Sequence, residues 1–481
     1  ASKNPLPEPV DTAATFPDVC RPPMPLILLL APVALLAALA PTTVIAPRAQ
    51  ALVADLPPAP TPPLAEGPPL SLAEALTRAR AAAPDLGILR ERVVQASLDV
   101  GRAWAQVKPR LDLTASYTRT QDPVPAPPTF LRGSADSVLG ALVLEVPLFN
   151  GRAFPAIATA NQLVDVARLT ETQQRIDLLL LVAATYYSGV QLRELYRVAF
   201  RLSGTTRDHA IEAQARFEAG QIQRSAAVRA RIDVLRADEE ARRAVNAYRS
   251  TKSQLAQLLD RRDTAFELTT PPDPPEEVRG AFPDLIRRAL RDRPEMAAAK
   301  VNEEIAARLH TDAVLQFFPT VSANAAYRYN NVEDFSGRTL TWAVTLALTL
   351  PLYDGGLRYV ALKDADSKER EARLSTRSQV ARIEDELRRG QLDLESARAL
   401  REEADHALVY ARENEELVRA QFEAGTATQV EVSDAQAALF QSEATALEET
   451  LAVQLAALRV ARAVGAFERQ ARSTKGSQED P

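Results

Sequence analysis

The chain has very few of the residues that bind metals or form disulfides. Cys20 is its single cysteine, and it has three histidines, His209, His310 and His406. One cysteine excludes a disulfide within the chain and a cluster of thiolate ligands. The histidines lie far apart in the sequence without metal-ligand spacing, so they are expected to be structural. No metal and no cofactor is predicted, and stability must come from packing or oligomerisation.

The chain also lacks an excess of charge of one sign and any catalytic motif. Its 57 basic residues nearly balance its 63 acidic residues, so a basic face for nucleic acid is not indicated. The sequence has no glycine-rich phosphate loop, no Ser/His/Asp or Cys/His arrangement and no metal-binding spacing. These absences argue against an enzyme and against a nucleic-acid partner.

One apolar run near the N-terminus, at 26–40, has the length of a signal-peptide core. It is too short for the ~20 residues of a membrane-spanning helix. A small-x-small cleavage site at 49–51 follows it. Residues 1–51 are therefore predicted to be a signal peptide region, with a retained anchor as the alternative. The Pro-rich residues 52–70 are expected to form an extended linker, and residues 468–481 a disordered tail.

The most informative feature that is present is an internal duplication. The segment 216–220, which ends in Phe-Glu-Ala-Gly, returns at 421–425, about 205 residues later. The segment 146–151, Val-Pro-Leu-Phe-Asn-Gly, returns as Leu-Pro-Leu-Tyr-Asp-Gly at 350–355, and Pro109 returns as Pro319. Three landmarks in the same order predict two copies of one domain-sized unit. We place these repeats at 71–270 and 284–467, with a linker at 271–283.

Each repeat contains two segments in which apolar and polar residues alternate. The first segment begins with the apolar positions Leu111, Leu113, Ala115 and Tyr117. The pattern predicts two β-hairpins: 110–149, with its second strand at 138–149, and 320–353, with strands at 320–330 and 339–353. The lengths suit transmembrane strands of ~9 to 11 residues. Four strands cannot close a barrel, and open edges cannot face lipid, so a membrane sheet would need several protomers. A small soluble sheet is the alternative.

Very long helices are predicted after each hairpin, at 154–219 and 357–423, each ~100 Å long at 1.5 Å per residue. Gly220 and Gly425 end them, because glycine takes the left-handed conformation at little cost. Shorter helices return at about 222–260 and 428–467, and others precede the strands up to Pro109 and Phe317. In each repeat the helix before the first strand and the returning helix together have about the same length as the long helix. Each repeat is therefore predicted to be a strand hairpin on an antiparallel helical rod.

The order of these elements resembles that of the TolC-like outer membrane efflux proteins of Gram-negative bacteria. The resemblance rests on the duplicated hairpin-and-rod unit, the Pro-Leu-aromatic-Asn/Asp-Gly signature at 147–151 and 351–355, and Phe-x-x-Gly at both helix turns. It covers about residues 70–467. It implies an α+β membrane protein, a homotrimer in outer-membrane lipid. Four strands from each protomer would form one twelve-stranded transmembrane β-barrel, and the helices a long antiparallel α-helical barrel, the periplasmic tunnel.

The resemblance further implies a passive exit duct of a tripartite efflux or type I secretion system. It would lie in the cell outer membrane with a large periplasmic portion, and its partners would be a periplasmic adaptor protein and an inner-membrane transporter. The adaptor contacts carried over from the family are the two turns: Ala219, Gly220, Gln221, Ile222, Ala424, Gly425, Thr426 and Ala427. The alternative is a coiled-coil scaffold or the adaptor itself, which leaves the membrane-length strands unexplained.

In the family the narrowest ring is often lined by carboxylates just after the second turn. Glu431 and Asp434 hold those positions here and, three residues apart, share one helix face. In a trimer they would form a periplasmic constriction that favours cations. By charge alone, two solvated carboxylates are the alternative.

The chain departs from the family's gate, which uses a tyrosine and a basic residue where this chain has Phe422 and Ala427. That lock therefore cannot form. Arg224 and Arg229 near the first turn are the possible gate partners, pairing across protomers with Glu431 or Asp434.

Overall fold

The computed structural model describes residues 58–60, 67–119, 136–271, 278–331 and 338–467. The predicted signal peptide at 1–51 and the predicted disordered tail at 468–481 lie outside these residues, as does most of the predicted linker at 52–70. None of the helices within the described ranges contains an apolar stretch long enough to cross a bilayer.

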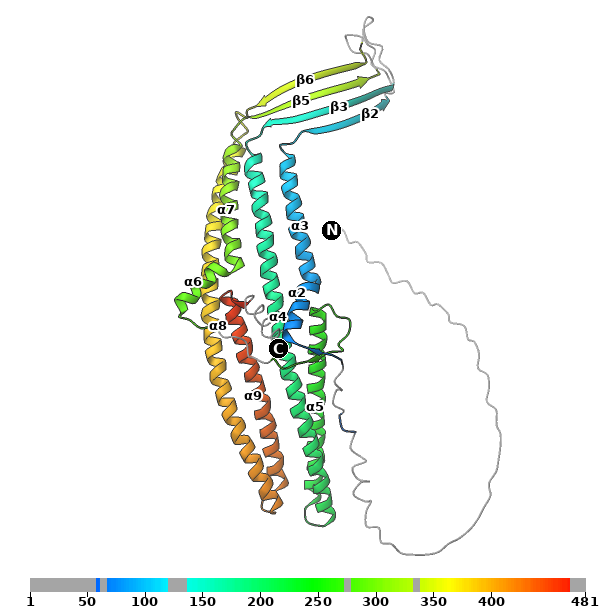
Figure 1. Cartoon of the computed structure of the whole chain (residues 1–481), viewed down its shortest axis with the longest axis vertical. Helices are drawn as coiled ribbons and strands as arrows, with labels where there is room; N and C mark the ends of the chain where they lie inside the picture. The colour runs from blue at the N-terminus through cyan, green and yellow to red at the C-terminus, as the bar shows by residue number, and fades with distance from the viewer. Residues whose placement is uncertain (1–57, 61–66, 120–135, 272–277, 332–337, 468–481) are drawn as a thin grey trace, which may run out of the picture. The chain divides into compact units, whose positions relative to one another are not determined.

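Four antiparallel strands form one sheet (Figure 1). The strands are β2 (Arg110–Arg119), β3 (Asp136–Phe149), β5 (Thr320–Asn330) and β6 (Leu340–Thr349). Their spatial order is β2-β3-β5-β6. Both predicted hairpins are confirmed, and the pairing of β3 with β5 joins the two repeats.

The two faces of this sheet differ in chemistry, because alternate side chains of a strand point to opposite faces. One face is apolar on all four strands, as in the paired row Leu113, Leu142, Tyr327 and Trp342. The opposite face carries mostly small and polar residues, as in the row Thr114, Ala141, Arg328 and Thr341. The apolar side chains are exposed in the single chain, up to 78% for Leu113. An apolar face of this extent marks an interaction surface.

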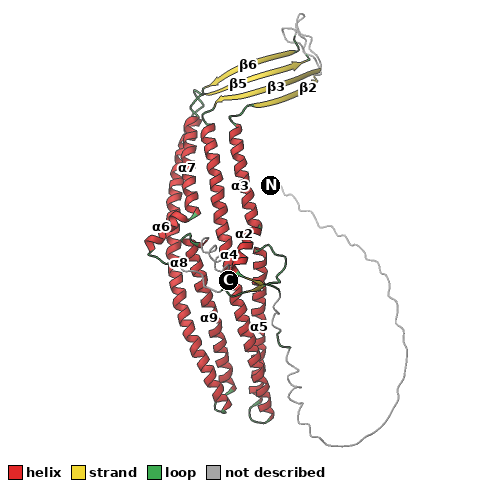
Figure 2. Cartoon of the chain, viewed as in Figure 1, coloured by secondary structure: helices red, strands yellow, loops and turns green. Residues whose placement is uncertain are grey.

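Four helices accompany each hairpin (Figure 2). The first repeat has α2 (Leu72–Ala82), α3 (Pro84–Ala105), α4 (Ala153–Glu218) and α5 (Arg224–Leu258). The second has α6 (Phe282–Asp292), α7 (Pro294–Leu315), α8 (Leu357–Glu423) and α9 (Gln429–Ala463). The two long helices are confirmed, with 66 residues in α4 and 67 in α8, and α4 begins one residue earlier than predicted.

The shorter helices lie end to end along the long ones, as predicted (Figure 1). Both α3 and α5 pack on α4, and both α7 and α9 pack on α8 and also on α4. The helical layer therefore runs from α3 and α5 through α4, then α7 and α9, to α8.

Several predicted boundaries were wrong. The returning helices α5 and α9 have 35 residues each and are shorter at both ends than the predicted 222–260 and 428–467, since they run from Arg224 to Leu258 and from Gln429 to Ala463. The helices α3 and α7 end at Ala105 and Leu315, ahead of Pro109 and Pro319. The residues that follow form a tighter turn, as in the bonds from Val107 N to Trp104 O and from Phe317 N to Val314 O. Strand β6 ends at Thr349 and not at 353.

Two segments predicted as linkers contain regular structure. The strand β1 (Pro69–Leu70) lies within the predicted linker 52–70 and pairs in parallel with β4 (Glu267–Leu268). Helix α6 begins at Phe282, within the predicted linker 271–283. A strand of two residues has no periodicity, so the sequence contained no signal for β1 or β4.

These two strands cover a core at the middle of the helices. Its largest fully buried side chains include Tyr186, Tyr248, Phe266 and Leu268. The Tyr186 hydroxyl lies 2.8 Å from Leu70 O and 2.6 Å from Thr269 O, so it fixes both strands to α4. Burial of each large side chain stabilises the fold by about 1.5–3 kcal/mol.

We expect Tyr186→Phe to lower the melting temperature of the purified protein by a few degrees. The ring still fills the core, but the carbonyl oxygens of Leu70 and Thr269 lose their shared donor, which costs ~1–2 kcal/mol. Tyr410→Phe is the matched control, because Tyr410 is 69% exposed. Equal melting temperatures for the two variants would show that the hydroxyl does not hold β1 and β4.

Candidate functional site

The two glycine turns share one backbone geometry. Gly220 and Gly425 have φ angles of 72° and 75°, in the left-handed region that favours glycine. In the first turn, Gly220 N donates to Phe217 O at 2.9 Å and Gln221 N donates to Arg216 O at 2.9 Å. The second turn repeats both bonds: Gly425 N donates to Phe422 O at 3.0 Å, and Thr426 N donates to Gln421 O at 2.9 Å. Both are Schellman motifs, so the sequence repeat encodes a repeated helix end.

The residues carried over as adaptor contacts are mostly open to solvent. Residues 219–221 and 424–426 are exposed. Ile222 and Ala427 are half-buried, and Ile222 packs on a small cluster that includes Ala213 and Val234. Each turn therefore presents three exposed residues on a packed base.

A contact that the sequence did not predict joins the two turns. The Arg216 guanidinium lies over the ring of Phe422, with its central carbon 4.4 Å from the ring centroid. Glu212 holds the same guanidinium through a hydrogen bond of 2.6 Å. Phe422 is 5% exposed, so the ring is enclosed in this contact. A cation–π contact of this kind contributes about 0.5–2 kcal/mol and ties the end of α4 to the end of α8.

Glu431 has a structural role that the family resemblance did not imply. Thr428 and Glu431 form a capping box at the start of α9: Thr428 N donates to Glu431 Oε2 at 2.6 Å, and Glu431 N donates to Thr428 Oγ1 at 3.4 Å. These hydrogen bonds from the Thr428 backbone and side chain lower the pKa of the Glu431 carboxyl. The carboxylate therefore stays ionised to a lower pH than an ordinary glutamate does.

Asp434 and Arg229 form an ion pair within one chain, with Arg229 Nη2 3.7 Å from Asp434 Oδ1. A second tie lies beside it, where Ser433 Oγ donates to Asp233 Oδ2 at 2.7 Å. The sequence prediction paired these residues across protomers, whereas in the single chain the pair joins α5 to α9. Arg224 is exposed and has no ion pair among the described residues.

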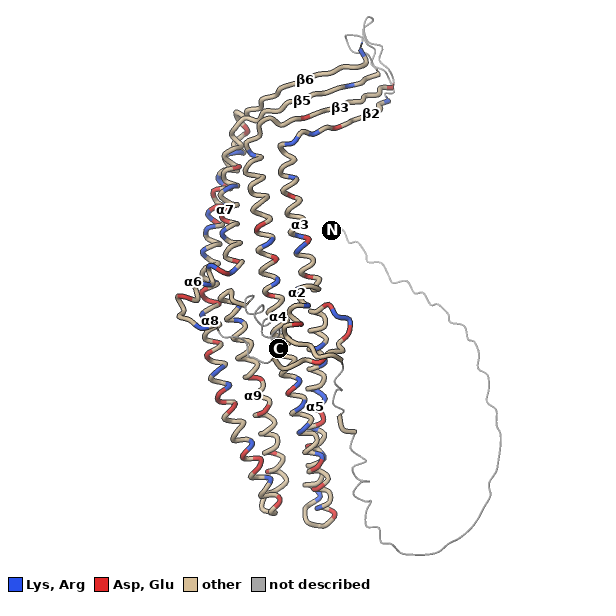
Figure 3. Tube along the Cα trace, viewed as in Figure 1, with Lys and Arg blue, Asp and Glu red and all other residues tan. Residues whose placement is uncertain are grey.

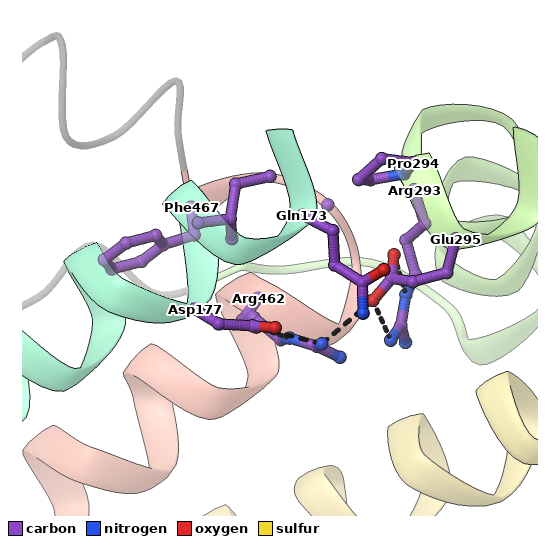
Figure 4. A pocket seen from close by; sticks show the side chains of 9 residues that line it. Gln173, Asp177, Arg293, Pro294, Glu295, Arg462 and Phe467 are labelled. Atoms are coloured by element: carbon purple, nitrogen blue, oxygen red, sulfur yellow. Dashed lines mark hydrogen bonds and ion pairs between the residues drawn. The ribbon is translucent and has the colours of Figure 1, made fainter. Parts of the chain in front are cut away.

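A second charged cluster, missed in the sequence, lies where α7 and α9 meet end to end (Figure 4). Arg462 of α9 reaches three carboxylates: Asp177 of α4 at 3.0 Å, Glu295 of α7 at 2.9 Å and Glu386 of α8 at 2.8 Å. Arg293, which is 3% exposed, donates to Glu295 at 3.1 Å and to Glu386 at 2.8 Å. These five side chains join four helices at one point.

The cluster is partly desolvated, and its charges compensate. Burial opposes ionisation of Glu295, but hydrogen bonds and charge from Arg293, and the charge of Arg462, outweigh it and hold the pKa of Glu295 below its usual range. Burial likewise opposes the charge of Arg462, yet Glu386, Glu295 and Asp177 keep its pKa raised. The cavity beside these groups measures about 10 Å³, enough for one water and no substrate.

The first repeat has no equivalent of this cluster. Gln257 stands at the position of Arg462, and Ala83 at that of Arg293. The corresponding helix junction packs on the aromatic core around Tyr186. Within the described residues there is also no group of three or more His, Cys, Asp or Glu that could hold a metal ion.

We expect Arg462→Met to destabilise the protein by ~3 kcal/mol, the lower end for removing one member of a buried ion pair, because its side chain is 17% exposed. Thermal unfolding measures this, with the exposed Arg459→Met as control. The pKa of Glu295 is lower in the folded chain than the usual 4.5, so its contribution is present above pH ~4.5 and is lost as pH falls through the folded value. The difference in stability between wild type and Arg462→Met should therefore shrink below pH ~4. A difference that stays constant down to pH 3 would contradict this assignment.

Comparison with known proteins gives one family. The family profile for outer membrane efflux proteins matches residues 75–261 and 285–466, one match in each repeat. No curated protein sequence matches the chain significantly.

Several solved structures share the fold. A membrane protein from Pseudomonas aeruginosa is 20% identical, with a TM-score of 0.71 over 82% of this chain and 93% of that chain. The outer membrane protein VceC from Vibrio cholerae is 19% identical, with a TM-score of 0.67 over 82% of this chain and 96% of that one. The Campylobacter jejuni CmeC outer membrane channel is 14% identical, with a TM-score of 0.71 over 85% and 89%.

The profile covers both repeats with their helices and strands, which is well over half of the chain. This match selects an outer-membrane efflux channel over the coiled-coil scaffold or adaptor alternative, and it makes the protein a transport duct and not an enzyme. The chain belongs to the outer membrane efflux protein family.

Proposed function

We propose that three copies of this chain form the channel-tunnel of a tripartite efflux or type I secretion system. Their strands close into one twelve-stranded barrel in the outer membrane, and their helices form a tunnel in the periplasm. The duct is passive, and a periplasmic adaptor and an inner-membrane transporter supply cargo and energy.

The observation that carries this proposal is the apolar face of the sheet together with its two open edges. The apolar face spans all four strands, and its side chains on β6 are among the most exposed of the chain, from Trp342 at 74% to Leu348 at 67%. Lipid is the environment that suits such a face. In lipid the edges of β2 and β6 must be paired, because unpaired backbone groups cost several kcal/mol each. Closure with further copies satisfies both demands.

The distribution of charge also supports strands in the membrane and helices in water. Charged residues are numerous along the helices and sparse on the strands (Figure 3). On the polar face of the sheet, Arg110 pairs with Asp112 at 2.8 Å and with Glu145 at 3.2 Å. A polar interior and an apolar exterior are the arrangement of a water-filled membrane barrel.

The two glycine turns are proposed as the periplasmic end that meets the adaptor, through residues 219–222 and 424–427. Glu431 and Asp434, just beyond the second turn, would form the constriction. The pair of Arg229 with Asp434 would hold this end closed, because it ties α5 to α9 within each protomer. Arg224 remains available to pair across protomers.

We expect Val344→Arg to prevent stable insertion into the outer membrane. Val344 lies near the middle of β6 on the apolar face, where an arginine costs ~2–4 kcal/mol in lipid. Thr345→Arg is the matched control, because it adds the same side chain one residue along on the polar face. The measurement is the amount of trimer-sized species in the outer-membrane fraction on unheated gels. Equal yields for both variants would exclude a lipid-facing sheet.

At the proposed constriction, we expect Glu431→Gln and Asp434→Asn each to lower the cation-to-anion permeability ratio by about two- to five-fold in planar bilayers. Glutamine at position 431 keeps the capping box and removes only the charge. Arg229→Ala should instead raise conductance, because it releases Asp434 and the tie to α5. Glu402→Gln, an exposed carboxylate elsewhere on α8, is the control. Unchanged selectivity in both acid variants would remove them from the conducting path.

A further inference from the structure

The two outer strands of the sheet, β2 and β6, have no strand partner on their outer side within the described residues. The apolar face nevertheless continues to both edges, through Leu113 on β2 and Leu346 on β6, each at least 70% exposed. If the proposed function is correct, these edges meet in a neighbouring copy. The register of that pairing decides which residues lie together in lipid.

The two hairpins of one chain have the same internal register. In the first, Arg110 lies opposite Glu145, and in the second, Thr320 lies opposite Thr349. The first strands are related by a step of 210 residues, from 110 to 320, and the second strands by a step of 204, from 145 to 349. The same steps carry Leu113 opposite Leu142 onto Ala323 opposite Leu346, which is also a pair in the structure. The hairpins are therefore equivalent modules.

The contact from one module to the next is already visible within the chain, between β3 and β5. There Leu142 lies opposite Tyr327, and Leu144 opposite Ala325. In a closed ring of equivalent modules, the contact from β6 to β2 of the next copy repeats this one. For each β3–β5 pair, adding 204 to the β3 residue number gives the residue on β6. Subtracting 210 from the β5 residue number gives its partner on β2 of the next copy.

We propose that β6 pairs antiparallel with β2 of a second copy in the register that places Leu346 opposite Tyr117 and Leu348 opposite Ala115. The polar face then pairs Thr349 with Thr114. Apolar residues then meet apolar residues from Leu346 to Leu350 on one face, and small or polar residues meet on the other, although neither face entered the calculation. The exception is Val344, which falls opposite Arg119 at the end of β2. A slip of one residue would exchange the faces.

The end of β6 carries an independent sign of a missing neighbour. Strand β3 extends to Phe149, beyond its last pair with β2 at Glu145, because β5 pairs with Val146, Pro147 and Phe149. The equivalent residues 350–353 are not strand in the single chain, and Tyr353 is 87% exposed. The proposed register gives these residues a partner: Leu350 lies opposite Leu113 of the second copy. We therefore expect β6 to lengthen on assembly.

Two polar contacts between α4 and α7, close to the β3–β5 pairing, do not repeat between copies. Within the chain, Arg152 binds Asp312 at 2.9 Å and Gln162 binds Glu304 at 2.7 Å. The same steps would place Gly356 opposite Arg102, and Asp366 opposite Val94. Neither pair can form an ion pair, so these two contacts are not repeated between copies.

Cysteine cross-linking in the full chain tests the register. Cys20 is the only native cysteine, so introduced pairs are read against little background. Opposite residues of an antiparallel pair lie ~4.5–5.5 Å apart between Cα atoms, within disulfide range. We expect Leu346→Cys with Tyr117→Cys to convert most of the outer-membrane protein into a covalent trimer on non-reducing gels. Thr349→Cys with Thr114→Cys, on the polar face, tests the same register where lipid contact is not altered.

Two controls define the outcome. Leu142→Cys with Tyr327→Cys should form a disulfide within one chain, because that pair is in the structure. Leu346→Cys with Arg119→Cys tests a slip of two residues. A covalent trimer with Arg119→Cys but not with Tyr117→Cys would overturn the register. Wild-type protein that forms no trimer-sized species and no conducting channel would instead overturn the proposed function.

Discussion

The hydrogen-bonded ladder between β3 and β5 is the contact on which the arrangement of the two repeats depends. It makes one sheet of two hairpins and so aligns their apolar residues on a single face. It also fixes the relative height of the helices that follow, because α4 begins four residues after the end of β3 and α8 begins eight residues after the end of β6. A register change here would expose polar groups on the apolar face, since the side-chain period of a strand is two residues.

The arrangement of the helices depends on their lengths and on the two glycine turns. Each long helix is accompanied by two shorter ones whose ends must meet at the middle of the rod, and the structure solves this junction in two ways. The first repeat buries aromatic side chains around Tyr186, whereas the second gathers five charged side chains around Arg462. The ionic junction of the second repeat weakens as its carboxylates become protonated. The duplicated repeats have thus diverged where helices meet, whereas both glycine turns keep the same backbone hydrogen bonds.

The residues proposed to act at the turns also stabilise the fold. Glu431 caps α9 and is also proposed to line the constriction, and its charge is fixed in position by the helix that it begins. Arg216 and Phe422 come from equivalent repeat segments, yet they contact each other and connect the two turns. The sequence placed Phe422, Glu431 and Asp434 near one end of the molecule, but it contained no signal for their partners. Arg216, Thr428 and Arg229 were identified as partners only by packing.

The sequence by itself determined the duplication, both hairpins, the two long helices and the glycine turns, because each depends on local periodicity, chain length or a left-handed residue. It also identified the family through the order of these elements. Only the tertiary structure decided the β3–β5 ladder, the short β1–β4 pairing and the cluster around Arg462, because these contacts join residues far apart in sequence that carry no shared pattern. The strand predicted to reach 353 ends at Thr349 because a strand forms where a neighbouring strand can pair with it, and β5 begins at Thr320, the partner of Thr349.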